Sequence, residues 1–243
     1  MKPPSQSGAG LRVLQATLNV TGVGATLDLD RIAFEAQTTE RLVRTTLSGT
    51  LGVNGQEVRL SPERRLRLAM EIARAGQLST AAKALTWQEF ERFAEDCLKE
   101  AGFEAERNVR VKGEGRAWQI DVVGFRGELV LAIDCKHWNT PGSLSSFKLA
   151  AIHQRVATLH FLTTLKEKAP EEGKGWQALA VILTLREPPS QFSENAVLVS
   201  VEMLPSFLSG VTPYDENLPF MASALGPVEN PMSQSKQERS RDS

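Results

Sequence analysis

Residues 129–138 read LVLAIDCKHW, and this stretch decides which fold the rest of the chain is expected to form. It is an apolar run of strand-forming residues that ends with an acid and a lysine two positions apart. Because side chains alternate across a strand, Asp134 and Lys136 share one face, while Cys135 points to the other. Burying charged groups in an apolar strand costs free energy unless they are paired or bound to something. The stretch therefore predicts a strand whose last residues, Asp134 and Lys136, are candidates for a functional site.

The preceding stretch, WQIDVVG at 118–124, has the same unusual feature, because Asp121 interrupts a run that otherwise suits a core. If the two strands pair as a hairpin around Arg126-Gly127, Asp121 and Asp134 lie near one another at the same end. Two neighbouring carboxylates repel each other, and a divalent cation is the usual remedy. A simpler interpretation also exists, in which Asp134 and Lys136 form only a polar strand end, paired with each other.

The elements around these two strands predict an α/β fold. A capping box at Thr86 and Glu89 opens a helix that ends at Gly102, and a long helix follows the three strands, with Leu149, Ile152, Val156 and Leu159 on its apolar side. The expected strands are 104–112, 117–124, 128–136, 179–185 and 196–201, and the expected later helices are 144–165 and 204–208. The order α-β-β-β-α-β-β predicts a mixed sheet with helices on its faces.

The first sixty residues follow a different pattern. Three helices are expected, around 11–18, 29–33 and 38–47, and a hairpin of 51–53 with 58–60 is expected around Asn54-Gly55. Three helices and a hairpin are the plan of a winged helix, although such small units also serve as dimerisation surfaces. A helix after Ser61-Pro62 would connect this unit to the rest. The predicted domains are a winged helix at 1–60, a connecting helix at 61–79, an α/β domain at 80–210 that contains Asp121, Asp134 and Lys136, and a largely disordered tail at 211–243.

Composition excludes several classes of protein. No apolar run reaches the roughly 18 residues of a membrane span, and MKPPSQSGAG is no signal peptide, so a cytoplasmic protein is expected. The two cysteines, Cys97 and Cys135, have no partner cluster that would make a zinc site. The net charge is −1, so any DNA binding must come from local basic patches.

Residues 86–160 resemble the PD-(D/E)xK nuclease superfamily, most closely its Mrr-like restriction endonucleases and archaeal Holliday junction resolvases. The resemblance lies in TWQEFERFAEDCLKEAGF at 86–103, WQIDVVG and LVLAIDCKHW. It implies a restriction-endonuclease-like fold with DNA as partner. Carried over by position, it also implies four catalytic residues, namely Glu91, Asp121, Asp134 and Lys136. The chain departs from the family motif in having Ile120 instead of proline and Asp134 where glutamate is common.

Such a site hydrolyses phosphodiester bonds with the help of a hard cation. Mg²⁺ is expected, with Mn²⁺ as a substitute, held by Asp121, Asp134 and the backbone carbonyl of Cys135. Lys136 would orient or help deprotonate the attacking water and stabilise developing charge. Glu91 would hold a metal-bound water or a second ion. No nucleotide cofactor is evident.

Further side chains are predicted to contact DNA. For the basic residues on the hairpin of the first two strands, a solvated outer face without DNA contact is an equally good interpretation. On the long helix, Gln154 resembles a glutamine that some relatives have at this place. The predicted contacts are Arg41, Arg44, Arg59, Arg110, Lys112, Arg116, Lys148, Gln154 and Arg155. His153 and the other histidines are interpreted as non-catalytic.

The leading function is Mg²⁺-dependent hydrolysis of DNA in restriction, repair or junction processing. One alternative is a DNA-binding regulator whose nuclease fold is structural, and another is an RNA-processing nuclease. Cutting both strands at once would need two sites, so a homodimer stays open.

Overall fold

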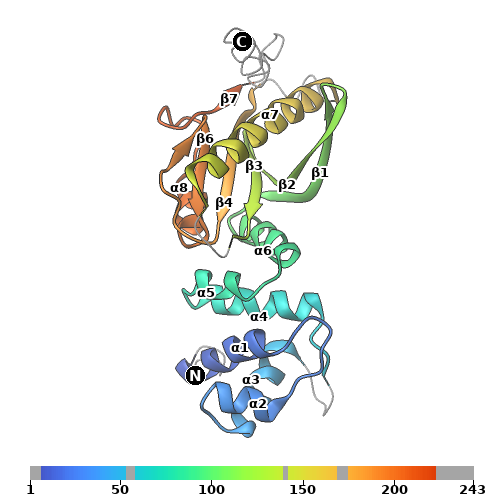
Figure 1. The fold of residues 1–243 in the computed structure, drawn as a ribbon, viewed down its shortest axis with the longest axis vertical. Helices are drawn as coiled ribbons and strands as arrows, with labels where there is room; N and C mark the ends of the chain where they lie inside the picture. Colours follow the sequence, from blue (N-terminus) through green and yellow to red (C-terminus); the bar gives the residue numbers. More distant parts are fainter. Residues whose placement is uncertain (1–6, 53–57, 139–141, 169–174, 223–243) are drawn as a thin grey trace, which may run out of the picture. The chain divides into compact units, whose positions relative to one another are not determined.

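The computed structural model describes residues 7–52, 58–138, 142–168 and 175–222 (Figure 1). The chain divides into two compact units, Met1–Ala94 and Glu95–Ser243. Within the described residues, no helix is long and apolar enough to cross a membrane.

The first unit is helical. It contains α1 (Gly8–Val20), α2 (Leu29–Glu35), α3 (Glu40–Leu51), α4 (Pro62–Arg74), α5 (Leu78–Lys83) and the first part of α6 (Trp87–Glu100). The side chains of Ser7, Asp28, Thr39 and Ser61 each accept a backbone N–H at the start of a helix, which explains where α1 to α4 begin. The short helix α5 was not predicted, because six residues are too few to show a period.

The predicted hairpin around Asn54-Gly55 is wrong in its first arm. Leu51 is the last residue of α3 and is buried, and Gly52 ends the helix in the left-handed conformation. The second arm pairs instead with the segment between α1 and α2. Leu27 N–H donates to the Val58 carbonyl at 2.9 Å, and a bridge joins Thr26 to Arg59. The turn itself lies outside the described residues.

A buried ion pair holds the first unit together. Arg65 on α4 donates from Nε to Glu89 Oε1 at 2.8 Å, and both side chains are 4% exposed. The same guanidinium donates to three backbone carbonyls, those of Leu18, Thr21 and Ala84. Glu89 also accepts the Thr86 N–H at 2.8 Å, which confirms the predicted capping box.

The second unit is built on one mixed sheet. Its strands are β1 (Glu104–Gly113), β2 (Arg116–Arg126), β3 (Leu129–Lys136), β4 (Gln177–Thr184), β5 (Phe192–Ser193), β6 (Ala196–Ser200) and β7 (Met221–Ala222). The order is β1-β2-β3-β4-β6-β5, with β7 paired to the start of β4. β1, β2 and β3 are antiparallel neighbours, whereas β3, β4 and β6 run parallel. The predicted mixed sheet is confirmed, and only the two-residue strands β5 and β7 were not foreseen.

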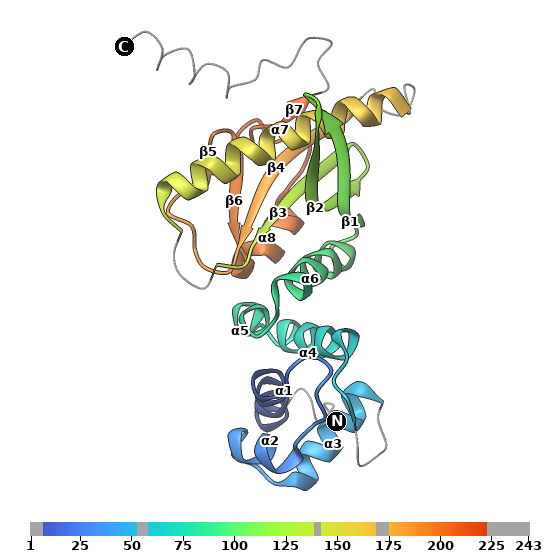
Figure 2. The ribbon, with the colours of Figure 1, turned by 45° about the vertical axis from the view of Figure 1, so that its right-hand side comes forward.

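Helix α7 (Leu144–Lys168) crosses one face of this sheet (Figures 1 and 2). The 3₁₀ turn Val201–Met203 and α8 (Leu204–Gly210) follow β6. The predicted apolar side of α7 is confirmed at Val156, which is 1% exposed, and wrong at Leu149, which is 63% exposed. The buried side also includes Phe147, Ala151, Gln154 and Phe161. A polar residue therefore lies in the buried stripe, which a search for apolar spacing passes over.

Candidate active site

The β2–β3 hairpin brings the two aspartates together. Its register ends with Val122 opposite Ile133, and Asp121 and Asp134 are the next residues of the two strands. The Asp121 carboxylate accepts the backbone N–H of Cys135 at 2.8 Å on Oδ2. The sequence prediction that these two acids lie at the same end of the hairpin agrees with this register.

Both carboxyl groups are held under conditions that disfavour their charge. Burial raises the pKa of Asp121, and the nearby charge of Asp134 raises it further, while the Cys135 N–H and Lys136 act in the opposite direction. Burial also raises the pKa of Asp134, with Lys136 opposing the shift. A bound cation would offset this effect, because a nearby positive charge favours the charged form of both carboxylates.

Lys136 compensates Asp134 only in part. Its Nζ donates to Asp134 Oδ1 at 3.0 Å and lies 2.8 Å from Oδ2 without the angle of a hydrogen bond. Asp134 Oδ2 is consequently buried with no hydrogen-bond donor among the described residues. The ion pair is also what a polar strand end would show, so by itself it does not distinguish a strand end from a functional site.

The sheet is irregular at Asp121. Trp118 and Ile120 belong to the core beneath α7, and so does Val123, so the alternation along β2 changes phase beside Asp121. The β1–β2 pairing is interrupted at Asn108, whose φ is +56°, and it continues in the same register on either side. The irregularity therefore changes which face of the sheet the side chains of β2 point to at the position of Asp121.

Helix α7 carries two neighbouring polar side chains, Gln154 and His153. Gln154 is fully buried, and neither its amide nitrogen nor its amide oxygen has a hydrogen-bond partner within the described part of the chain. Its neighbour His153 lies with its ring centroid 4.8 Å from that of Trp118. Burial lowers the pKa of His153, the charges of Arg116 and Lys136 lower it further, and Asp121 opposes them. Sequence reasoning set His153 aside, because nothing in its spacing relates it to Asp121.

The basic side chains of the second unit differ in their surroundings. Arg110, Lys112 and Arg116 are exposed on β1 and β2, and the Arg116 guanidinium lies 3.5 Å from the centre of the Trp118 ring system. Lys148 forms an ion pair with Glu194 at 3.2 Å, and Arg155 is partly buried. Their contact with DNA stays a prediction.

The remaining predicted residues belong to the first unit. Arg41, Arg44 and Arg59 are exposed, and Arg44 pairs with Glu40 one turn earlier on α3. Glu91 is buried on α6, 5% exposed, and its part in the site stays a prediction.

The donors of the second unit suit a hard cation. Among the described residues no group of three or more His, Cys, Asp or Glu side chains is arranged to hold a metal. The site offers two carboxylates, one with an unsatisfied oxygen, and a backbone carbonyl would have to complete the set. Oxygen donors of this kind fit Mg²⁺, which keeps several waters and binds through one or two carboxylates.

Residues 82–173 match the family model Mrr_cat, described as a restriction endonuclease. The match confirms the resemblance to restriction endonucleases seen in the sequence, and it confirms a restriction-endonuclease-like fold for this region. No curated protein matches the chain.

Two solved structures resemble parts of the chain. One is a protein of unknown function, AF1548, with 22% identity and a TM-score of 0.35 over 47% of this chain and 58% of that protein. The other is protein VC1899 from Vibrio cholerae, with 14% identity and a TM-score of 0.33 over 84% of this chain and 51% of that protein. The chain thus spans between half and three fifths of the length of these two proteins.

Proposed function

We propose, from the restriction endonuclease match at residues 82–173, that the protein is a metal-dependent endonuclease that hydrolyses DNA phosphodiester bonds. The observation that carries the proposal is the pair Asp121 and Asp134, two partly buried acids with raised pKa values and one oxygen without a donor. Such a pair destabilises the folded protein unless a ligand compensates it, so its presence is better explained by a function than by folding.

Asp121, Asp134 and the Cys135 carbonyl would hold the ion, for which Mg²⁺ is proposed and Mn²⁺ is the expected substitute. When bound, the metal would polarise a phosphoryl oxygen and lower the pKa of a water. The N–H of Cys135 orients the Asp121 carboxylate, which also receives a hydrogen bond from the Gln119 side chain. The Asp134 carboxylate is held from one side by Lys136.

Lys136 supplies the positive charge for the chemical step. Its side chain is 27% exposed, so the ammonium can reach both Asp134 and a phosphate that arrives from solvent. There it would orient the attacking water and stabilise the charge that develops on the phosphoryl oxygens. Gln154, with both amide atoms unsatisfied, is proposed to position a water or a phosphate oxygen. Glu91 is proposed to hold a metal-bound water.

Basic side chains are proposed to bind the DNA backbone. On the second unit these are Arg110, Lys112, Arg116, Lys148 and Arg155, and on the first unit Arg41, Arg44 and Arg59. The first unit is proposed to be a winged-helix DNA-binding module. A DNA-binding regulator without activity is not favoured, because Asp121, Asp134 and Lys136 are all present together.

A cleavage panel tests this proposal. Linear, branched, methylated and single-stranded DNA and RNA are incubated with Mg²⁺, Mn²⁺ or EDTA, and product is measured against time. Wild type should cut DNA only with a divalent ion, and Asp134→Asn should lose cleavage by orders of magnitude. Asp96→Asn is the matched control, because burial raises the pKa of Asp96 too, outside the site. Full cleavage by Asp134→Asn, or cleavage undiminished in EDTA, would overturn the mechanism.

A further inference from the structure

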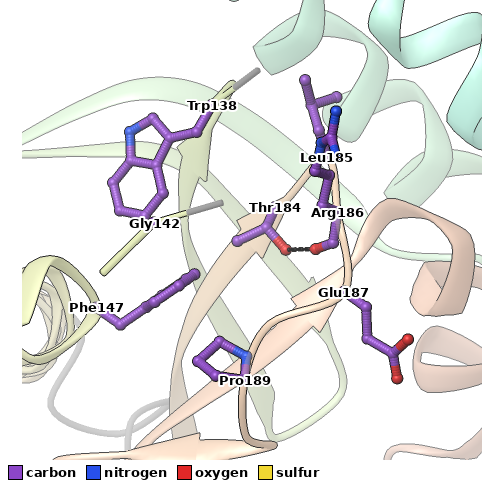
Figure 3. A pocket seen from close by; sticks show the side chains of 8 residues that line it. All are labelled: Trp138, Gly142, Phe147, Thr184, Leu185, Arg186, Glu187 and Pro189. Atoms are coloured by element: carbon purple, nitrogen blue, oxygen red, sulfur yellow. Dashed lines mark hydrogen bonds between the residues drawn. The ribbon is translucent and has the colours of Figure 1, made fainter. Parts of the chain in front are cut away.

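A pocket of about 140 Å³ lies beyond the ends of β3 and β4. Figure 3 shows it between the rings of Trp138 and Phe147 on one side and the segment 184–189 on the other. Leu185 and Pro189 contribute apolar surface there, and Arg186 contributes charge. The pocket is smaller than the roughly 300 Å³ at which drug-sized sites begin, so it suits one small group.

This pocket adjoins the candidate active site within the same sheet. In the parallel β3–β4 register Lys136 stands beside Thr184, which lines the pocket, and Asp134 stands beside Ile182. Neighbouring strands are about 4.8 Å apart. Phe147 packs against Ile182, and Trp138 packs against the same cluster. Trp138 also follows Lys136 by two residues, a reach of at most about 7 Å along the chain.

The walls of the pocket suit a flat aromatic group with polar edges. The Trp138 and Phe147 rings meet edge to face, with centroids 5.1 Å apart and planes at 67°. The backbone at Gly142 lies directly against the indole, since a Cβ there would be 2.4 Å from the ring. Thr184 Oγ1 donates to the Arg186 carbonyl at 2.6 Å, which fixes the start of the opposite wall. Arg186 and Glu187 are exposed and can meet the edge of a ring.

We propose that this pocket takes one unstacked nucleobase of the DNA strand that is being cut. The inference rests on the proposed function and names its substrate class, which is DNA with an unpaired base next to the scissile phosphate. A phosphate at Lys136 lies within about one nucleotide length of Trp138, so the base belongs to the substrate strand and not to a free nucleotide. Pulling a paired base out of a duplex costs the free energy of its pairing and stacking, and an unpaired base avoids most of that cost.

The first experiment compares cleavage of two duplexes that differ only in one unpaired base near the cut. Wild type should prefer the unpaired substrate in kcat/KM by about tenfold or more, because stacking on an aromatic side chain contributes that much per base. Trp138→Ala should abolish the preference, whereas Trp138→Phe should keep most of it. Trp87→Ala removes an exposed tryptophan of the first unit and is the control. A wild type without preference, or a preference unchanged in Trp138→Ala, would overturn the proposal.

The second experiment measures binding without cleavage. DNA with 2-aminopurine at the unpaired position is titrated with protein in EDTA, and quenching of its fluorescence reports stacking. Trp138→Ala should lose the quenching, and Arg186→Ala, which keeps the rings, should retain it while binding more weakly. If no DNA is cut under any condition but quenching depends on Trp138, the proposed function fails and the pocket assignment stands. Quenching that is equal in Trp138→Ala and wild type, with both variants folded by circular dichroism, would overturn the pocket assignment.

Discussion

Both units of the protein bury charged side chains, and they do so in opposite ways. In the first unit Arg65 meets one carboxylate and three carbonyls, and Glu89 accepts a further backbone N–H. In the second unit two carboxylates share a single lysine, both have raised pKa values, and Asp134 Oδ2 has no donor within the described residues. The first cluster is electrically balanced and closed, whereas the second carries excess negative charge and is partly open to solvent.

Under the proposed function, the first cluster is buried to stabilise the fold and the second is buried to take part in a reaction. A satisfied pair such as Arg65 and Glu89 is costly to break, because either partner alone would be an uncompensated buried charge. A poorly satisfied pair such as Asp121 and Asp134 costs stability as it stands, and it lowers that cost only when a cation binds. Substitutions in the first cluster should therefore lower the free energy of unfolding, whereas substitutions in the second should lower the rate of DNA cleavage.

The largest effect is expected in the closed cluster. Arg65→Leu should lower the free energy of unfolding of the first unit by about 3–5 kcal/mol, since Glu89 is left buried without its cation. The measurement is urea unfolding followed by circular dichroism. The double variant Arg65→Leu, Glu89→Gln should recover part of the loss, and Arg74→Ala, half exposed, should change stability by less than about 0.5 kcal/mol. A loss no larger for Arg65→Leu than for Arg74→Ala would show that the pair contributes little.

In the open cluster the corresponding change should act on the rate. Lys136→Ala should lower the single-turnover rate of DNA cleavage about 10²–10³-fold, because a group that stabilises transition-state charge is lost. Thermal stability should hold in the presence of Mg²⁺, and metal affinity should change little. Lys99→Ala is the control, because Lys99 also pairs with an acid, Glu95, away from the site. A normal rate for Lys136→Ala would leave Lys136 as a structural strand end.

The sequence was informative where a residue type conflicts with its local pattern. Asp121 and Asp134 stand out because each interrupts an apolar strand, and the hairpin between them follows from adjacent strands. The family match then covers the same region. The capping box at Thr86 and Glu89 was equally visible, since both partners lie within one turn.

Residues whose partners are distant in the sequence could not be predicted. Arg65 looks like one more arginine of a basic helix, and its partners on α1 and near α6 appear only in three dimensions. Gln154 lies in the buried stripe of α7, where apolar spacing favoured Leu149 instead. His153 comes near the site only because α7 crosses the sheet above β2. The pocket beside Trp138 depends on residues from two separate segments of the chain, 138–147 and 184–189.

A smaller effect is expected on the exposed surface of the first unit. Arg41→Ala, Arg44→Ala should weaken DNA binding about tenfold and reduce the slope of log affinity against log salt by about 2, since two phosphate contacts are lost. Arg44 already pairs with Glu40, so Arg41→Ala alone should give more than half of the effect. Arg31→Ala, Arg74→Ala has the same change in charge and is the control. Unchanged affinity and slope, with an altered oligomeric state after removal of residues 1–60, would assign dimerisation to this unit.

The smallest effect concerns the stability that the open cluster costs. Asp121→Asn keeps an oxygen that can accept the Cys135 N–H and removes one of the two charges, so in EDTA it should melt at the same temperature as wild type or a few degrees higher. Between the usual aspartate pKa of 3.8 and the raised value of the folded protein, the native state holds more protons than the unfolded state. Wild-type stability from this group therefore falls as the pH rises through that window, whereas the asparagine variant has no such dependence. The advantage of Asp121→Asn in melting temperature should be largest at neutral pH and should disappear as the pH falls toward 3.8.

Addition of Mg²⁺ should make wild type melt at a higher temperature than Asp121→Asn, because the ion stabilises only the protein that binds it. Melting curves at several pH values, with and without Mg²⁺, give both results, and a variant that is less stable than wild type in EDTA at neutral pH would mean that Asp121 is held for folding, as Glu89 is.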